Sequence, residues 1–216
     1  MYTVKAVFEG EAGLFCSPIH NVERFSYPCP TISAARGMME TILYHPEFRF
    51  EVYKISILHP IKRFNIRVNE TTECFNPKGG FINTCKTRTQ RNQYVLDNPS
   101  FLIEAKIILT EKGKNEVGST GKNTPEKFVA MFNRMLKKGQ GNKVTCMGQK
   151  ELIAFPRVAT EDDKPIEWNE VVYNLLYDSF NLDTKKPFAT YFDAKIVNGV
   201  IDVPSWESIK LGGQNV

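Results

Sequence analysis

Three side chains near the ends of two predicted helices could carry out acid–base or phosphate chemistry. Lys127 comes in the first turn after Thr124-Pro125, where unpaired backbone N–H groups and the helix dipole favour an anion. Tyr44 and His45 follow the other predicted helix and supply a hydroxyl and an imidazole, a possible acid/base pair. Lys127, Tyr44 and His45 are therefore the candidate catalytic residues. A place at the edge of the core without a catalytic role stays open for Tyr44 and His45.

Basic side chains gather in two blocks in the middle of the chain. Residues 54–91 hold eight Lys or Arg and two acidic residues, and residues 106–150 hold ten and three, whereas both ends are acidic on balance. In CKTRTQRNQY (85–94), Arg and Lys alternate with Thr, Gln and Asn, a mixture typical of single-stranded RNA binding. The two blocks predict one polyanion footprint, a continuous groove, although ordinary solvated faces stay open as an alternative. The candidate RNA-binding residues are Lys62, Arg63, Arg67, Lys86, Arg88, Arg91, Lys122, Arg134, Lys137 and Lys138.

Metal and nucleotide-triphosphate sites are not indicated. The three histidines and five cysteines form no CxxC or HxxxH pair, so the sequence predicts no metal site. Residues 116–124, EVGSTGKNT, resemble a phosphate loop, but Glu116 and Asn123 stand where that motif needs Gly and Ser or Thr. We therefore expect no cofactor.

Size and composition indicate a globular protein. The 216 residues, 42% hydrophobic and 24% charged, fit one domain, or one domain with a small appendage. No apolar run approaches the roughly 18–20 residues of a membrane span, and the first residues lack the basic flank and apolar core of a signal peptide. Five scattered cysteines are too few for a secreted disulfide scaffold. We expect a cytoplasmic protein with reduced thiols and no membrane contact.

The pattern of apolar residues predicts alternating strands and helices. Helices are expected at 31–44 and 125–138, behind Thr caps, and strands at 2–9, 48–58, 61–68, 100–110 and 144–154. This order, β-α-β-β-β-α-β, is close to the ferredoxin-like pattern.

The remaining segments are less regular. Residues 48–58 and 61–68 are expected to pair as a two-stranded ribbon, and 70–99 to form a long insertion loop. Residues 111–123 are expected to form a basic, flexible loop. For 167–180 both strand and helix stay open, and 187–203 are a final piece of sheet.

The segment SYPCPTISAARGMMETILYHPEFRFEVYKISILHPI (26–61) resembles the N-terminal signature of the fifth CRISPR-associated Cas family, in its subtype I-C form. Further stretches match the family in the same order, and together they cover nearly the whole chain. They are NIRVNE (65–70), RTQRNQYVLDNPSFLIEAKIILT (88–110), FNRMLKKGQ (132–140), CMGQKE (146–151) and FDAKIVNGVIDVPS (192–205).

The resemblance implies an α+β fold: a ferredoxin-like, RNA-recognition-motif-like domain with a β-hairpin thumb insertion, and a small C-terminal β-sheet. On this chain, the domain would span 1–155, with the thumb at about 61–99, and a β-rich subdomain would span 156–216. Members bind the repeat-derived 5′ handle of CRISPR RNA and assemble with the backbone and large subunits of the type I-C Cascade complex, which engages target DNA. In subtype I-C the same subunit also cuts precursor CRISPR RNA without metal, leaving a 2′,3′-cyclic phosphate.

The family's proposed active site is a tyrosine at the end of the first helix and a Lys-His pair at the start of the second. The tyrosine position corresponds to Leu43, with Tyr44 one residue further on. The Lys-His pair corresponds to Lys127 and Phe128, or alternatively to Lys122 and Asn123. In both alignments the histidine is absent.

Two other functions stay open. A non-catalytic Cascade subunit that only caps the 5′ end of the RNA would need neither histidine nor tyrosine. An unrelated protein that binds a small ligand would show no salt-sensitive RNA binding.

Overall fold

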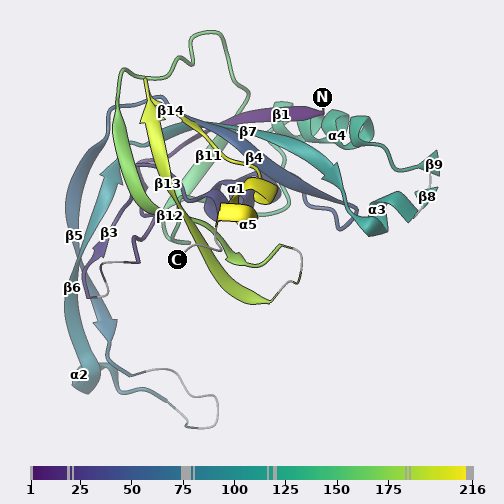
Figure 1. The fold of residues 1–216 in the computed structure, drawn as a ribbon. Helices are drawn as coiled ribbons and strands as arrows, with labels where there is room; N and C mark the ends of the chain where they lie inside the picture. Colours follow the sequence, from purple (N-terminus) through teal and green to yellow (C-terminus); the bar gives the residue numbers. More distant parts are fainter. Residues whose placement is uncertain are drawn as a thin grey trace.

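The computed structural model describes residues 2–18, 20, 22–73, 79, 81–115, 117–118, 121–182, 184 and 186–212. Its centre is one eight-stranded antiparallel sheet, and the described part of the chain also contains five short helices, of which α2 (Thr84–Thr87) lies at the tip of a projecting hairpin (Figure 1). In sheet order the strands are β10 (Thr145–Cys146), β11 (Ile153–Arg157), β1 (Thr3–Glu9), β7 (Ser100–Leu109), β4 (Phe48–Ile57), β14 (Val200–Asp202), β13 (Pro187–Val197) and β12 (Glu170–Phe180). The fold is therefore a mixed α/β fold with a large antiparallel sheet, as the α+β prediction requires.

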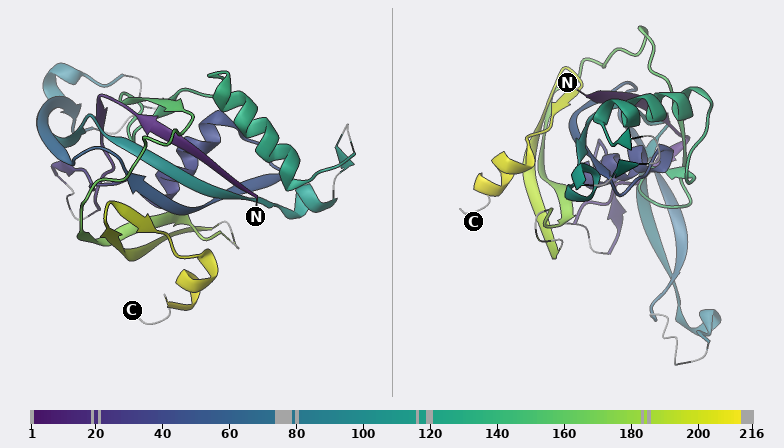
Figure 2. Two further views of the ribbon diagram at one scale, coloured as in Figure 1. Left: turned by 90° about the horizontal axis from the view of Figure 1, so that it is seen from above. Right: turned by 90° about the vertical axis from the view of Figure 1, so that its right-hand side faces the viewer.

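Two amphipathic helices, α1 (Ile32–Ile42) and α4 (Pro125–Lys137), contact each other and cover the same face of this sheet (Figure 2). The hydroxyls of Thr31 and Thr124 cap them by accepting hydrogen bonds from the N–H groups of Ala34 and Lys127. Both predicted caps are confirmed. As expected, α1 buries its apolar stripe: Ile32, Ala35, Met38, Met39 and Ile42.

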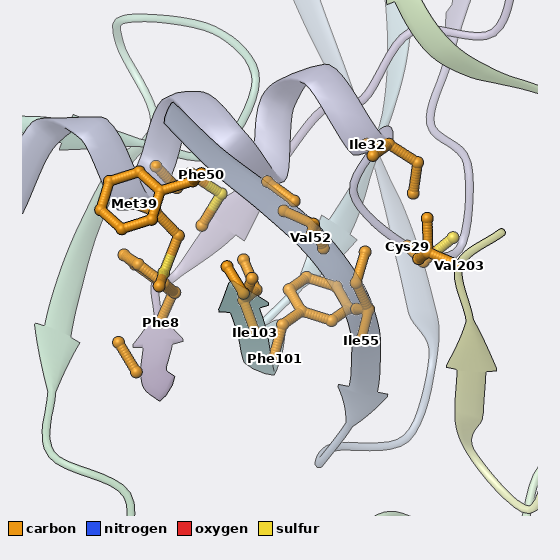
Figure 3. Packing of buried hydrophobic residues seen from close by; sticks show 14 of the residues in the cluster. Phe8, Cys29, Ile32, Met39, Phe50, Val52, Ile55, Phe101, Ile103 and Val203 are labelled. Carbon is orange, nitrogen blue, oxygen red and sulfur yellow. The ribbon is translucent and has the colours of Figure 1, made fainter. Parts of the chain in front are cut away.

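The core between helices and sheet is built from alternate strand residues. Phe8, Phe101 and Ile103 point from β1 and β7 toward Met39 of α1 (Figure 3). An aromatic cluster continues it under α4: the Phe48 and Phe128 rings are 4.7 Å apart between centroids. This packing fixes the start of α4 against the start of β4.

The last strands of the chain extend the same sheet. β14 pairs with β4 at Lys54–Ser56, and β13 and β12 follow outward from it. The prediction of a small C-terminal sheet is thus corrected in one respect: those strands are continuous with the main sheet. The segment 167–180, left open between strand and helix, contains a strand, β12. The last helix, α5 (Trp206–Gly212), packs Trp206 against Tyr177 at 5.9 Å between ring centroids.

A long hairpin projects from the sheet and is called the thumb hairpin below (Figure 1). It consists of β5 (Lys62–Thr71), the four-residue helix α2 (Thr84–Thr87) and β6 (Arg88–Asp97), and the two strands pair along their full length. The short strands β2 (Ala12–Gly13) and β3 (Arg24–Phe25) pair with β6 near its base. The predicted hairpin insertion is confirmed.

Three local predictions are wrong. Residues 48–58 and 61–68 do not pair as a ribbon, because β4 lies between β7 and β14 and β5 pairs with β6. The expected loop at 70–99 contains β6. The expected strand at 144–154 is two separate strands, because Gly148 turns the chain with a φ of 86° between them.

The basic segment 111–123 also contains regular structure. It forms the five-residue helix α3 (Glu111–Asn115) and a two-stranded piece, β8 (Val117–Gly118) with β9 (Gly121–Lys122). A membrane-spanning helix, long and apolar enough to cross a bilayer, is not found among the described residues.

Candidate active site and nucleic-acid interface

Lys127 lies in the first turn of α4, where the sequence placed it. Its ammonium donates a hydrogen bond to the Asn123 side-chain oxygen at 3.1 Å and lies 5.6 Å from the centroid of the Phe128 ring. The side chain is half-buried, so its direction is fixed while part of it stays accessible. A lysine held in this way at the start of a helix, where the helix dipole favours an anion, can bind a phosphate.

His45 lies in the short connection between α1 and β4 and is oriented by a carboxylate. Its Nδ1 is 3.0 Å from Glu47 Oε2. A carboxylate only accepts hydrogen bonds, so Nδ1 carries the proton and, in the neutral ring, Nε2 keeps a free lone pair. This leaves Nε2 able to accept a proton from a substrate hydroxyl.

Glu47 is tuned by the same contact. Burial opposes its ionisation, but the hydrogen bond from His45 and a backbone N–H outweigh burial and lower its pKa below the usual value. Its carboxylate therefore stays charged and would stabilise an imidazolium at His45.

Phe128 connects the two candidate groups. The ring is 1% exposed and lies 5.8 Å from the His45 ring, between centroids, and 5.6 Å from the Lys127 ammonium. In the alignment that sets Lys127 and Phe128 against the family's Lys-His pair, the histidine position holds a buried core ring, which cannot transfer a proton. A histidine from a different element, His45, is beside it instead.

Tyr44 takes a different direction. It is 58% exposed and lines a cavity between α1, β4 and β12, whereas Leu43, at the family's tyrosine position, is the buried C-cap of α1. Lys127 and His45 therefore both lie near the Phe128 ring. Tyr44 is the neighbour of His45 in sequence, but its side chain lines the cavity.

The thumb hairpin has two different faces, because opposite residues of an antiparallel pair project to the same side. One face carries Arg67 opposite Asn92, and Arg88 opposite Thr71. The pair between them is Asn69 opposite Gln90, and Asn65 opposite Tyr94 follows beyond Arg67. Arg67 and Arg88 are exposed, and no ion pair involves either of them among the described residues. Within the described part of the two strands, this polar face carries guanidinium and amide groups and no carboxylate of its own, and the Asn92 amide donates a hydrogen bond to the Glu23 carboxylate at 2.9 Å.

Two other predicted residues hold the hairpin in place. The Arg63 guanidinium lies 4.8 Å from the centroid of the Phe25 ring and donates to the Ser26 carbonyl at 3.3 Å. Burial lowers its pKa. Arg91, on the opposite face, lies 3.4 Å from the Glu70 carboxylate and donates to the Val22 carbonyl. Both are better described as anchors than as free phosphate ligands.

The remaining basic candidates are spread over other elements. Lys62 begins β5 and Lys86 lies in α2, both exposed. Arg134 and Lys137 are exposed in the last turns of α4, and Lys138 is its C-cap. Lys122 lies in β9, but its side chain is outside the described residues.

The expected continuous basic groove is not formed. The thumb hairpin and α4 lie at opposite ends of the molecule in each view (Figures 1 and 2). β4 starts at Phe48, beside Phe128, and its ten residues end at Ile57, near the base of the hairpin. At 3.3 Å per residue these ends are about 30 Å apart. The basic side chains therefore form two regions.

Two site residues, Glu47 and Asn123, had no role in the sequence-based site. Glu47 could have been found from its His-x-Glu spacing, since Pro46 prevents the helix from continuing and keeps both side chains on one short turn. Asn123 precedes the predicted cap Thr124, so the spacing of helix residues did not indicate its contact with Lys127. Groups of three or more His, Cys, Asp or Glu that could hold a metal are not found among the described residues.

Comparisons with known proteins place these features in a family. Residues 3–204 match the family described as "CRISPR-associated protein (Cas_Cas5)" through its Cas5d model. A "CRISPR pre-crRNA endoribonuclease Cas5d" of Mannheimia succiniciproducens is 30% identical over 221 residues, covering 90% of this chain and 92% of that protein. A protein of the same description from Thermus thermophilus is 35% identical over 155 residues, covering 72% of this chain but only 63% of its own length.

A solved structure has the same overall fold. It is described as "Crystal Structure of CRISPR-associated Protein" and superposes with a TM-score of 0.71 over 95% of this chain and 93% of that one, at 19% identity. The fold is thus shared with a protein whose sequence has diverged widely.

Proposed function

The chain belongs to the Cas5d family of CRISPR-associated proteins, and we propose that it binds the repeat-derived 5′ handle of CRISPR RNA and cuts the precursor RNA. The observation that carries the cleavage proposal is the convergence of Lys127 and the carboxylate-oriented His45 on the Phe128 ring. A phosphate-binding cation beside a histidine with a free Nε2 is the minimum equipment for cutting RNA without metal.

The reaction follows from the groups present. His45 Nε2 accepts the proton of the ribose 2′-OH, and O2′ attacks the adjacent phosphorus. The phosphorus–O5′ bond breaks, which leaves a 2′,3′-cyclic phosphate on one product. The departing 5′ oxygen takes a proton from solvent, and the His45 imidazolium then releases the proton it accepted to solvent, which restores the base. Lys127 stabilises the extra negative charge of the pentavalent phosphorane.

This assignment explains how the chain can work without the family's Lys-His pair. Phe128 takes the histidine position and joins the core, and the imidazole is supplied by His45 from the α1–β4 connection. Glu47 gives that imidazole the tautomer that a general base needs. The same chemistry is therefore reached from a different element.

RNA binding is assigned mainly to the polar face of the thumb hairpin. Arg67 and Arg88 project there among amide side chains, and no ion pair involves either guanidinium among the described residues, which suits an unpaired RNA strand. Two observations support a ferredoxin-like unit over 1–155, followed by the C-terminal strands of 156–216. Along the chain its main elements come in the order β1, α1, β4, β7, α4, β11, and in the sheet its strands are neighbours in the order β11-β1-β7-β4.

The assembly partners follow from family membership. We propose that the chain joins the backbone and large subunits of a type I-C Cascade complex in the cytoplasm and reaches target DNA through that complex. The test is co-purification of the chain with those subunits and a CRISPR RNA, and loss of the chain from the complex when the thumb hairpin is shortened.

A direct experiment tests cleavage. Purified protein is incubated with repeat RNA in EDTA at stoichiometric concentration, and the product ends are identified by mass. Products with a 2′,3′-cyclic phosphate and a 5′-OH are expected. Intact RNA under these conditions would instead support the second function, a subunit that only caps the 5′ end. The burial of Leu43 and Phe128 at the family's tyrosine and histidine positions favours that second function.

A further inference from the structure

A cavity of about 390 Å³ lies beside Tyr44, between α1, β4 and β12. It exists because β14 pairs with β4 only at Lys54–Ser56, so the edge of β4 from Arg49 to Val52 faces the cavity and not another strand. The ion pair between Arg36 of α1 and Asp178 of β12 closes the opposite side. Its volume is in the range of small-molecule sites.

The lining combines apolar walls with a few fixed polar groups. Ile32, Phe50, Val52 and Leu182 form much of the wall. Asp178 is only 1% exposed, and its carboxylate is held by Arg36 and by the Phe180 N–H at 3.1 Å. Arg36 also lies 3.6 Å from Glu40. The polar groups are thus held in place before any ligand arrives.

The charge of the cavity decides which part of a nucleotide suits it. Among the described residues, its lining holds two guanidinium groups and three carboxylates. The site therefore has no excess positive charge for a phosphate. A planar, uncharged ring with donors and acceptors along one edge fits better, because Tyr44 can stack on its face and the strand edge and charged groups can pair with its edge.

The position of the cavity connects it to the proposed cleavage site. Tyr44 and Thr110 line it, and Thr110 is joined to the His45–Glu47 segment by hydrogen bonds to the Pro46 and Glu47 carbonyls at 2.8 and 2.9 Å. One side of this short segment faces the cavity, and His45 on the other side faces Phe128. We propose that the cavity holds one unstacked nucleobase of the RNA next to the scissile phosphate, an inference that rests on the proposed function.

The test combines abasic RNAs with a variant that fills the cavity. Each nucleotide within three of the cut is replaced in turn by an abasic unit, and single-turnover cleavage is measured. One position is expected to lose about 10-fold, the usual effect of losing one stacked base. Leu182→Trp should slow the intact RNA by a similar factor and have no further effect on that abasic RNA. Val171→Trp, exposed on β12 outside the cavity, is the control.

A second readout does not depend on cleavage. For the binding measurement, 2-aminopurine is placed at the sensitive position, or at each position in turn if the RNA is not cut, and Lys127→Met protein is used. The 2-aminopurine fluorescence should change on binding, because the base leaves its stack in the RNA and enters the cavity. Phe180→Ala, at the cavity, should reduce that change, and Phe188→Ala, also exposed on the same hairpin but outside the cavity lining, should not.

The outcomes separate the two proposals. RNA that is bound and cut at equal rates for every abasic position, with unchanged fluorescence, would overturn the cavity assignment and leave the proposed function standing. If the RNA is bound but not cut, the 2-aminopurine fluorescence alone tests the cavity assignment. RNA that does not bind would overturn both. A free nucleoside monophosphate that raises the melting temperature of the wild-type protein but not of Leu182→Trp, with no abasic effect, would assign the cavity to a free nucleotide and overturn the proposal.

Discussion

The thumb hairpin and the end of the sheet where α1 meets α4 both carry basic side chains, but they hold them differently. On the hairpin, Arg67 and Arg88 are exposed on a face of amides. At the other end, Lys127 is hydrogen-bonded to Asn123, and His45 to Glu47. Exposed charges on a flat ribbon can follow a flexible strand, whereas oriented groups beside a buried ring can act on one phosphate. We therefore assign RNA affinity to the hairpin and the cleavage chemistry to the end where α1 meets α4.

The sheet keeps these two regions apart. β4 and β7 are ten-residue strands that pair side by side from one region to the other. Changes at one end should therefore leave the other nearly unaffected, since substitutions so far apart with no shared partners are usually additive. Each prediction below tests that independence.

The largest effect is expected from Lys127→Met. Removing the ammonium deletes the stabilisation of the phosphorane, and the single-turnover cleavage rate should fall about 10²–10³-fold. RNA affinity, measured by filter binding, should change less than about threefold, because most phosphate contacts lie elsewhere. Lys195→Met, an exposed lysine of β13, is the matched control. A parallel loss of affinity and rate would mean that Lys127 binds RNA without acting in catalysis.

A smaller effect is expected from Glu47→Gln, which weakens the orientation of His45. Losing one charge-assisted hydrogen bond should slow cleavage about 10–100-fold at unchanged affinity. Because Glu47 is a positioning residue, Glu47→Asp should restore part of the rate if its carboxylate still reaches Nδ1. Equal losses for Gln and Asp would indicate that Glu47 only supports the local fold.

The hairpin should show the opposite behaviour. The double variant Arg67→Ala and Arg88→Ala should weaken RNA binding about tenfold and reduce the slope of log affinity against log salt by about 1.4, as expected for two phosphates on a single strand. The cleavage rate at saturating protein should stay the same. Lys195→Ala is the control. A cleavage defect at saturation would show that the two ends are coupled, contrary to the comparison.

The core of this architecture could be predicted from the sequence because it depends on apolar periodicity. The spacing from Ile32 to Ile42 predicted α1 and its buried face, and strict alternation predicted β4. β6 was missed because its outer half alternates between polar residues on both faces, such as Arg91 and Asn92. β6 is a strand because it pairs with β5, and pairing with a distant segment leaves no signal in the local sequence pattern.

The site could be predicted only in part, for a similar reason. Lys127 and His45 were found from helix ends, but nothing in the sequence indicates that both reach one ring. The two basic blocks suggested a single groove because the sequence shows only where charges lie along the chain, not where they lie in space. The strands then separate the blocks by about 30 Å, at about 3.3 Å per residue.

The smallest effect concerns the thumb-side end of the sheet, where Arg157 donates two hydrogen bonds to Asp163 at 2.8 and 2.6 Å and one to Glu9 at 2.7 Å. The Arg157 guanidinium holds the pKa of the Asp163 carboxyl well below its usual range. A lowered carboxyl pKa stabilises the fold above the unfolded pKa, and this stability is lost as pH falls.

Asp163→Asn should therefore lower the free energy of unfolding by about 1–3 kcal/mol at pH 7. The difference from wild type should narrow below about pH 4, where the unfolded carboxyl of the parent protein becomes protonated. Urea unfolding at a series of pH values measures it. Because Asp163 acts through Arg157, which also binds Glu9 at the far end of β1 from α4, the cleavage rate of the folded variant should not change. A slower cleavage rate would mean that a loss of rigidity at one end of the sheet affects the other end. The sheet would then couple the two regions as well as separate them.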